Sequence, residues 1–130
     1  MTYLHKLIDL AEANRTLDPF YEEKTSEEFF EWMLEEIDEW KEEYAKWDFE
    51  ELESEMWDVI WDFFLLVNKL EDEWKINKER IFEKMYNKIS SRKSFLLEWR
   101  KVDKDEAMKI WNDAKRKEWY SEDRLWKAED

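Results

Sequence analysis

Hydrophobic residues recur at spacings of three and four along most of this chain, and that period predicts helices. The first predicted helix covers residues 2–13. Its apolar stripe consists of Leu4, Leu7, Ile8 and Ala11. Residues 14–24 interrupt the pattern and contain Asp18 and Pro19, which favour a turn. We therefore expect one amphipathic helix followed by the one obvious loop of the chain.

A long second helix is predicted from residue 25 or 26 to about residue 46. Thr25 and Glu28 have the spacing of a capping box, in which each side chain bonds the other's backbone N–H at the helix start. The apolar stripe of this helix comprises Phe29, Met33, Trp40, Tyr44 and Trp47. Glu36 interrupts this stripe, so an acidic side chain lies in line with the face that otherwise packs inward.

The third predicted helix starts near Asp48, which has a glutamate three residues on and is a candidate N-cap. It extends to about residue 74 and is apolar almost all round over residues 56–67. A tight turn near residue 47 would make the second and third helices an antiparallel pair. The third helix carries more apolar surface than a lone thin bundle can cover.

Two shorter helices are predicted in the C-terminal half. The fourth opens at residue 77 or 78 and ends near residues 94–99. The fifth opens at the capping-box pair Asp103 and Glu106 and continues to about residue 119. Beyond it the chain is mostly polar, and we expect a frayed end.

Composition supports an all-α fold. The 130 residues include no glycine and one proline, whereas a sheet protein normally needs glycine in its tight turns. A hydrophobic content of 43% is too high for a disordered acidic chain. We expect an antiparallel bundle of about five helices over residues 1–119, with a polar C-terminal extension over residues 120–130.

Charge and targeting signals narrow the possible partners and compartment. The net charge of −14 argues against general affinity for nucleic acid or anionic membranes. Without cysteine the chain has neither disulfides nor thiolate metal ligands. The N-terminus lacks a signal-peptide pattern, and the most apolar run, residues 59–67, is interrupted by Asp62 and too short to span a bilayer. We expect a cytoplasmic protein that binds neither nucleic acid nor membrane.

Four carboxylates differ from the solvated acids around them. Glu36 and Glu39 are spaced i, i+3, as are Glu55 and Asp58, so each pair projects from one helix face. Asp58 lies among apolar neighbours, where an ionised carboxylate is costly unless it is paired or metal-bound. Four carboxylates meeting across an antiparallel pair suit Mg²⁺ or Mn²⁺ better than zinc. A carboxylate network paired with Lys or Arg is an equally open interpretation.

The acidic pattern resembles the EExxE…ExxD signature of MazG-type nucleoside triphosphate pyrophosphohydrolases, in the all-α NTP pyrophosphatase superfamily. In this chain the signature comprises Glu35, Glu36, Glu39, Glu55 and Asp58. Further similar segments cover residues 18–29, 48–64, 84–95 and 105–118. The resemblance is collinear over about residues 4–118.

Three positions depart from the family pattern. Residues 94–96 replace the usual His-Pro-His-type sequence after the basic segment. Trp57 stands where a glycine often precedes the motif aspartate. Asp62 occupies a position that is commonly an amide. All of the signature acids are nevertheless present.

The resemblance implies hydrolysis of nucleoside triphosphates between the α and β phosphates, giving the monophosphate and pyrophosphate. Carried over by position, Glu36, Glu39, Glu55 and Asp58 are the expected Mg²⁺ ligands, with Mn²⁺ as a possible replacement. Such a metal neutralises developing charge and activates a water. Glu35 is a candidate to orient or deprotonate that water, and an exposed helix-face glutamate is the alternative interpretation.

The resemblance also implies substrate-binding residues and an oligomer. Lys88, Arg92 and Lys115 align with basic family positions and are expected to hold the polyphosphate. Trp111 could stack on the base, with core packing as the alternative. Relatives of this size form dimers or tetramers, and the apolar excess on the third helix agrees with this. We expect a homodimer or homotetramer in which a second subunit completes the core.

Other functions stay open. A dUTPase or dCTPase, or a phosphoribosyl-ATP pyrophosphohydrolase, shares the same acidic scaffold. An alternative of another class is a non-enzymatic helical interaction protein whose acidic face binds a basic partner.

Overall fold

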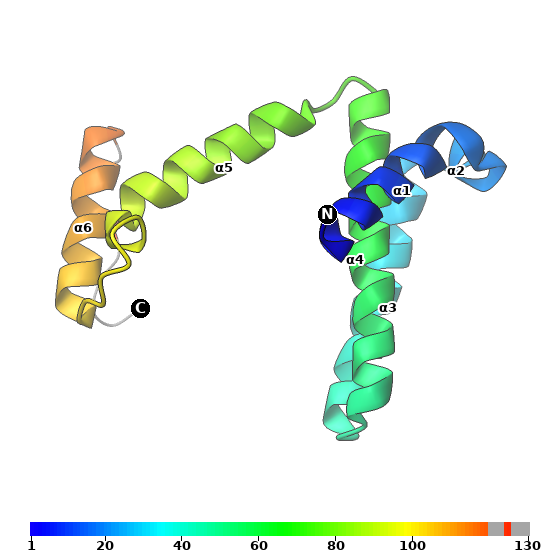
Figure 1. Ribbon diagram of the computed structural model, residues 1–130, viewed down its shortest axis with the longest axis horizontal. Coiled ribbons are helices and arrows are strands. Elements are labelled where there is room, and N and C mark those ends of the chain that lie inside the picture. Colours follow the sequence, from blue (N-terminus) through cyan, green and yellow to red (C-terminus); the bar gives the residue numbers. More distant parts are fainter. Residues whose placement is uncertain (120–123, 126–130) are drawn as a thin grey trace. The chain divides into compact units, whose positions relative to one another are not determined.

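The computed structural model describes residues 1–119 and 124–125, and this part of the chain is all-α, as predicted (Figure 1). The helices are α1 Tyr3–Leu17, α2 Pro19–Glu23, α3 Ser26–Ala45, α4 Phe49–Asp72, α5 Lys78–Arg92 and α6 Lys104–Lys117, with a 3-10 turn, η1, at Ser94–Leu96. Within the described residues no helix is long and apolar enough to cross a membrane. The chain divides into two compact units, residues 1–78 and 79–130.

The N-terminal unit is built on a hairpin of α3 and α4, and α1 packs against α4 (Figure 1). The predicted caps form: Thr25 Oγ1 accepts from the Glu28 backbone N–H, and Asp48 accepts from that of Glu51, each at 3.2 Å. The core lies where the N-terminal end of α3 meets the C-terminal half of α4. Its buried residues are Tyr21, Phe29, Leu65 and Leu66.

The prediction of a loop over residues 14–24 is wrong. The first helix continues to Leu17, and the short helix α2 starts at Pro19. Asp18 caps α2 by accepting from the backbone N–H of Phe20 at 3.0 Å, and proline fits the first helical position because its missing N–H is not needed there. This helix places Tyr21 in the core, where 3% of the residue is exposed.

An ionic network fastens α1 and α2 to the C-terminal end of α4. The guanidinium of Arg15 donates to Asp72 at 2.6 Å and to Glu71 at 3.0 Å. The Tyr21 hydroxyl donates to the other Asp72 oxygen at 2.6 Å. Glu71 also accepts from the backbone N–H of Lys78 at 2.7 Å. The network therefore holds α1 and α2 against α4, where they cover the core of the N-terminal unit.

The C-terminal unit comprises α5 after its first residue, η1 and α6. The predicted fourth helix ends earlier than expected, at Arg92, and the chain continues into η1. Asp103 caps α6 as predicted, accepting from the Glu106 backbone N–H at 2.8 Å. Most of the expected extension, residues 120–123 and 126–130, lies outside the described residues; within it Leu125 is buried.

Four tryptophans end helical segments in an unusual backbone conformation. Among the described residues, those with positive φ are Trp47 (58°), Trp74 (62°), Trp99 (50°) and Trp119 (67°). This left-handed region is normally occupied by glycine, because a Cβ costs about 1–2 kcal/mol there. Trp74, Trp99 and Trp119 are also more than 90% exposed, so packing does not offset the cost.

We expect Trp74→Gly to raise the free energy of unfolding by about 0.5–1 kcal/mol, because strain is relieved while the unfolded chain gains some freedom. Chemical denaturation of the full chain measures this. Trp57→Gly is the matched control, since Trp57 is also exposed but lies inside α4. There glycine should lower stability by about 1 kcal/mol. Equal effects of both substitutions would contradict a strained helix end.

Candidate metal centre

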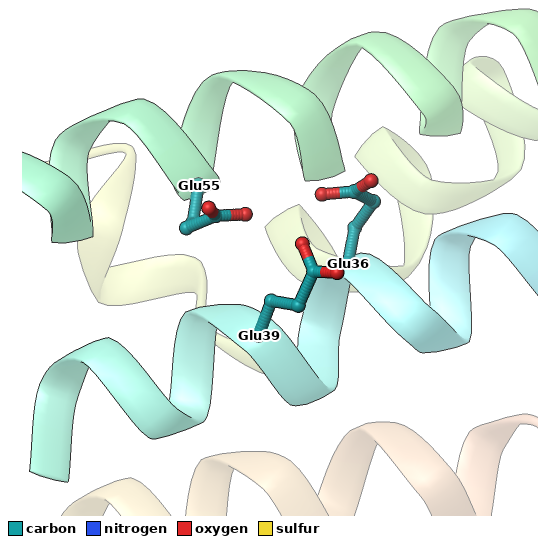
Figure 2. A group of neighbouring side chains, drawn as sticks. All are labelled: Glu36, Glu39 and Glu55. Atoms are coloured by element: carbon teal, nitrogen blue, oxygen red, sulfur yellow. The ribbon is translucent and has the colours of Figure 1, made fainter.

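Three of the predicted metal ligands converge between α3 and α4. Glu36 and Glu39 lie one helical turn apart on α3, and Glu55 faces them from α4 (Figure 2). One carboxylate oxygen from each lies within 4.8 Å of the other two. The i, i+3 spacing and the antiparallel hairpin therefore produce the convergence that the sequence predicted for these three residues.

The cluster is rich in negative charge. Among the described residues no Lys or Arg forms an ion pair with these three acids. Glu36 and Glu55 are half-buried, and in each the Oε2 atom is buried without a hydrogen-bond partner. Burial raises the pKa of Glu36 to about 7, and the nearby charges of Glu39 and Asp58 add to the shift. The predicted alternative of a network paired with Lys or Arg is therefore absent from the described residues.

Asp58, the fourth expected ligand, lies outside this group of three. The prediction that its apolar neighbours enclose it is wrong, because its side chain is exposed. Asp58 instead lines a groove of about 460 Å³ whose other lining residues are Leu7, Trp57, Ile60, Trp61 and Phe64. Burial raises the pKa of Glu55, and the charge of Asp58 adds to this shift as it does for Glu36.

Asp62 lies one turn further along α4. It is half-buried, and burial raises its pKa to about 6, with a further contribution from the charge of Asp58. This stretch of α4 therefore carries a half-buried carboxylate, Asp62, close to the exposed charge of Asp58.

The donor set fits a hard divalent cation. Carboxylate oxygens are the ligands that Mg²⁺ and Mn²⁺ prefer, and opposite ligands of Mg²⁺ lie about 4.2 Å apart. The three oxygens lie within 4.8 Å of one another, which is comparable to this span and is compatible with ligands of one bound ion. A cation would also supply the partner that the buried oxygens of Glu36 and Glu55 lack. Glu35, the candidate for handling the water, is an exposed residue of α3.

The residues expected to hold the substrate all lie in the C-terminal unit. Arg92 is buried, and its guanidinium lies 5.2 Å from the centre of the Trp111 ring. Lys88 is exposed on α5, and the ammonium of Lys115 donates to the backbone carbonyl of Arg124 at 2.6 Å. Trp111 is half-buried. The structure thus groups Arg92 with Trp111 within this unit.

A polar pocket of about 330 Å³ in the same unit contains residues that the sequence did not single out. Its lining consists of Lys84, Asn87, Lys88, Arg92 and Glu118. The position of Lys84 four residues before Lys88 could have indicated a shared helix face. Glu118 comes from the end of α6 and had no such signal.

Comparisons with known proteins agree with this all-α fold and its acidic hairpin. Residues 24–96 match the MazG nucleotide pyrophosphohydrolase domain. A mazG-related protein from Thermotoga maritima, known from a crystal structure, superposes with a TM-score of 0.79 at 31% identity over 86% of this chain and 98% of that chain. The comparison with curated proteins gave no match. The chain belongs to the MazG nucleotide pyrophosphohydrolase family, which implies hydrolase activity on nucleotides.

The raised pKa of Glu36 predicts that the metal-free protein becomes less stable as pH rises. Between the ordinary carboxyl pKa of 4.5 and about 7, the folded protein keeps a proton on Glu36 that the unfolded chain has lost. Stability from this group is complete below 4.5 and is lost through pH 7, with a slope of at most about 1.4 kcal/mol per pH unit for one proton. Denaturation in EDTA at several pH values measures it.

Glu36→Gln should flatten this pH dependence. Glu42→Gln is the control, because it removes the same charge from an exposed position of α3 and should keep the slope. A wild-type slope that survives in Glu36→Gln would show that the proton is held elsewhere.

Proposed function

We propose that this protein is an Mg²⁺-dependent nucleoside triphosphate pyrophosphohydrolase that clears nucleotides from the cellular pool. It would cleave NTPs and dNTPs between the α and β phosphates to the monophosphate and pyrophosphate. The observation that carries the proposal is the convergence of Glu36, Glu39 and Glu55 across the α3–α4 hairpin within the family domain. Mn²⁺ has the same ligand preference and is a possible replacement.

The chemistry assigns separate tasks to the acidic side chains. Glu36, Glu39 and Glu55, with Asp58 beside them, would hold the ion, which supplies charge neutralisation and a more acidic water when bound. Glu36 must be ionised to act as a ligand. The water oxygen attacks a phosphorus that flanks the α–β bridge, and the P–O bond between that phosphorus and the bridging oxygen breaks. Attack at the α phosphorus expels pyrophosphate, whereas attack at the β phosphorus expels the monophosphate. Glu35 is proposed to orient that water or to accept its proton.

The cationic residues of the C-terminal unit complement a polyphosphate. Lys88, Arg92 and Lys115 are proposed to bind phosphate oxygens, and Trp111 to stack on the base. Arg suits this task because its planar guanidinium bonds two oxygens of one phosphate. An otherwise acidic protein needs such placed cations to bind a polyanion.

A homo-oligomer, dimer or tetramer, is part of the proposal. Large apolar side chains of α4 are exposed within one chain, including Trp57 at 68% and Phe63 at 47%. A second copy would cover such a face and complete the helical core. Light scattering on the purified protein tests this, and the mass of a single chain at working concentration would exclude it.

We expect pyrophosphate release from a panel of canonical and modified NTPs and dNTPs when Mg²⁺ is present, and none in EDTA. Glu36→Gln and Glu55→Gln should lower kcat/KM about 100-fold or more, because each removes a proposed ligand. Glu42→Gln should retain wild-type activity. Isothermal titration with Mg²⁺ should show the matching loss of metal binding.

The panel separates the alternatives. Activity confined to dUTP or dCTP, or to phosphoribosyl-ATP, would replace broad nucleotide clearance by one of those specific reactions. No turnover on any nucleotide, with unchanged metal binding in Glu36→Gln, would reject the enzyme and favour an acidic interaction protein.

A further inference from the structure

The polar pocket of the C-terminal unit has a carboxylate bound to its most buried cation. Lys84, Lys88 and Arg92 lie at i, i+4 and i+8 along α5 and therefore share one face. The Arg92 side chain is 5% exposed, and its Nη2 atom lies 2.7 Å from an oxygen of Glu118. Asn87 adds an amide to the lining, so the pocket holds three cations, one amide and one anion.

The two lysines of this pocket lack a charged partner in the part of the chain that the structure describes. Neither Lys84 nor Lys88 forms an ion pair there, and the one carboxylate of the lining is bound to Arg92. A buried guanidinium needs an anion, because it cannot lose its proton. A phosphate group would satisfy Arg92 with two parallel hydrogen bonds and bring the charge that the lysines lack.

Glu118 is placed so that it can be displaced. It follows the last residue of α6 as its C-cap, and a third of its side chain is exposed, whereas Arg92 is held inside the unit. Rotation of the Glu118 side chain into water would break its ion pair with Arg92 without moving a helix. The fixed cation and the movable anion have the arrangement of a site that exchanges one anion for another.

We propose that this pocket binds a phosphate or pyrophosphate group and that Glu118 is an internal counter-ion which the group displaces from Arg92. The proposal rests on the proposed function, since the group would be part of the triphosphate or the pyrophosphate product. Competition by Glu118 reduces the apparent affinity for the anion, because only the fraction of protein in which the Arg92–Glu118 ion pair is broken can bind it. Glu118 is thus a positioning residue that sets phosphate affinity.

Titration of the full chain with pyrophosphate in EDTA, followed by isothermal calorimetry, tests this directly. Glu118→Gln should tighten binding about five- to tenfold, because the competing charge is lost while an oxygen acceptor is kept. Lys84→Gln, an exposed position, should weaken it by a similar factor. Glu83→Gln is the control, because it changes the net charge equally on the same helix and should stay within about twofold of wild type.

Unchanged or weaker binding by Glu118→Gln would overturn the displacement, and so would the absence of pyrophosphate binding by any variant. Wild-type binding by Lys84→Gln would remove the phosphate pocket. The titration requires neither Mg²⁺ nor turnover. A protein that hydrolyses no nucleotide but shows the predicted affinities would therefore contradict the proposed function and leave this inference standing.

The backbone at the four left-handed tryptophans carries a second and independent inference. Three of the segments that precede them close with both hydrogen bonds of a Schellman motif. After α3 these are Trp47 N–H to Tyr44 O at 3.2 Å and Asp48 N–H to Glu43 O at 3.4 Å, and the same pair follows α4 and η1. Glycine is the usual residue at the left-handed position of this motif.

Composition points in the same direction. Average usage of about 7% glycine predicts about nine in a chain of this length, and the sequence has none but ten tryptophans. Every positive-φ residue in the described ranges is tryptophan, while the other five tryptophans of those ranges lie inside helices. One bulky residue in this conformation is already an outlier. Four outliers that are all tryptophan require a common cause.

We infer that the natural protein carries glycine at positions 47, 74, 99 and 119, because a codon translated here as tryptophan is read as glycine by the source organism. The codon UGA is read as stop, tryptophan or glycine in different genetic codes. Peptide mass spectrometry of the protein isolated from its own organism tests this. Each peptide that spans one of these positions should have the mass expected with glycine there. Masses that correspond to tryptophan at the four positions would overturn the inference.

Discussion

The repulsion between carboxylates across the α3–α4 hairpin is the constraint on which the rest of the N-terminal unit depends. Glu36, Glu39 and Glu55 point toward one another, and a buried oxygen on each of two of them has no hydrogen-bond partner (Figure 2). Such an arrangement favours separation of the two helices. Their association must therefore be stabilised elsewhere along the hairpin.

That stabilisation lies at the end of the hairpin away from its turn. Phe29 of α3 packs there with Leu65 and Leu66 of α4, and Tyr21 closes the cluster from α2. The hydroxyl of Tyr21 and the guanidinium of Arg15 both donate to Asp72, so polar contacts fix the segment that covers the core. Stability and chemistry thus occupy different parts of one hairpin, as expected where a functional site is locally unfavourable.

The sequence predicted the parts of this arrangement that depend on local spacing. The i, i+3 spacing of Glu36 and Glu39, and the turn after α3, were sufficient to bring Glu55 opposite them. The exposure of Asp58 was not predictable in this way, because it depends on what covers α4 rather than on its neighbours in sequence. The segment of Asp18 and Pro19 was misread because an N-cap followed by proline starts a helix as readily as a turn.

Neither the long-range ion pairs nor the backbone outliers could be predicted from the sequence. The partner of Arg15 lies 57 residues away, and no periodicity links them. The tryptophans at helix ends contributed to the apolar pattern instead, because side-chain hydrophobicity carries no information about φ. Only coordinates separate Trp47, which ends α3, from Trp40, which lies within its face.

The acidic cluster between α3 and α4 and the basic pocket of the C-terminal unit carry opposite charges, and each charge is compensated in a different way. A carboxylate that lacks a cation can take up a proton, and the pKa of Glu36 near 7 shows that this fallback operates close to neutral pH. A guanidinium has no such fallback, because it stays protonated at any pH at which the protein folds. The buried Arg92 must therefore always have an anion, and Glu118 supplies one. The acidic site can remain without a cation because Glu36 can become a neutral acid. The basic site, in contrast, needs a counter-ion of its own, Glu118, which a ligand can replace.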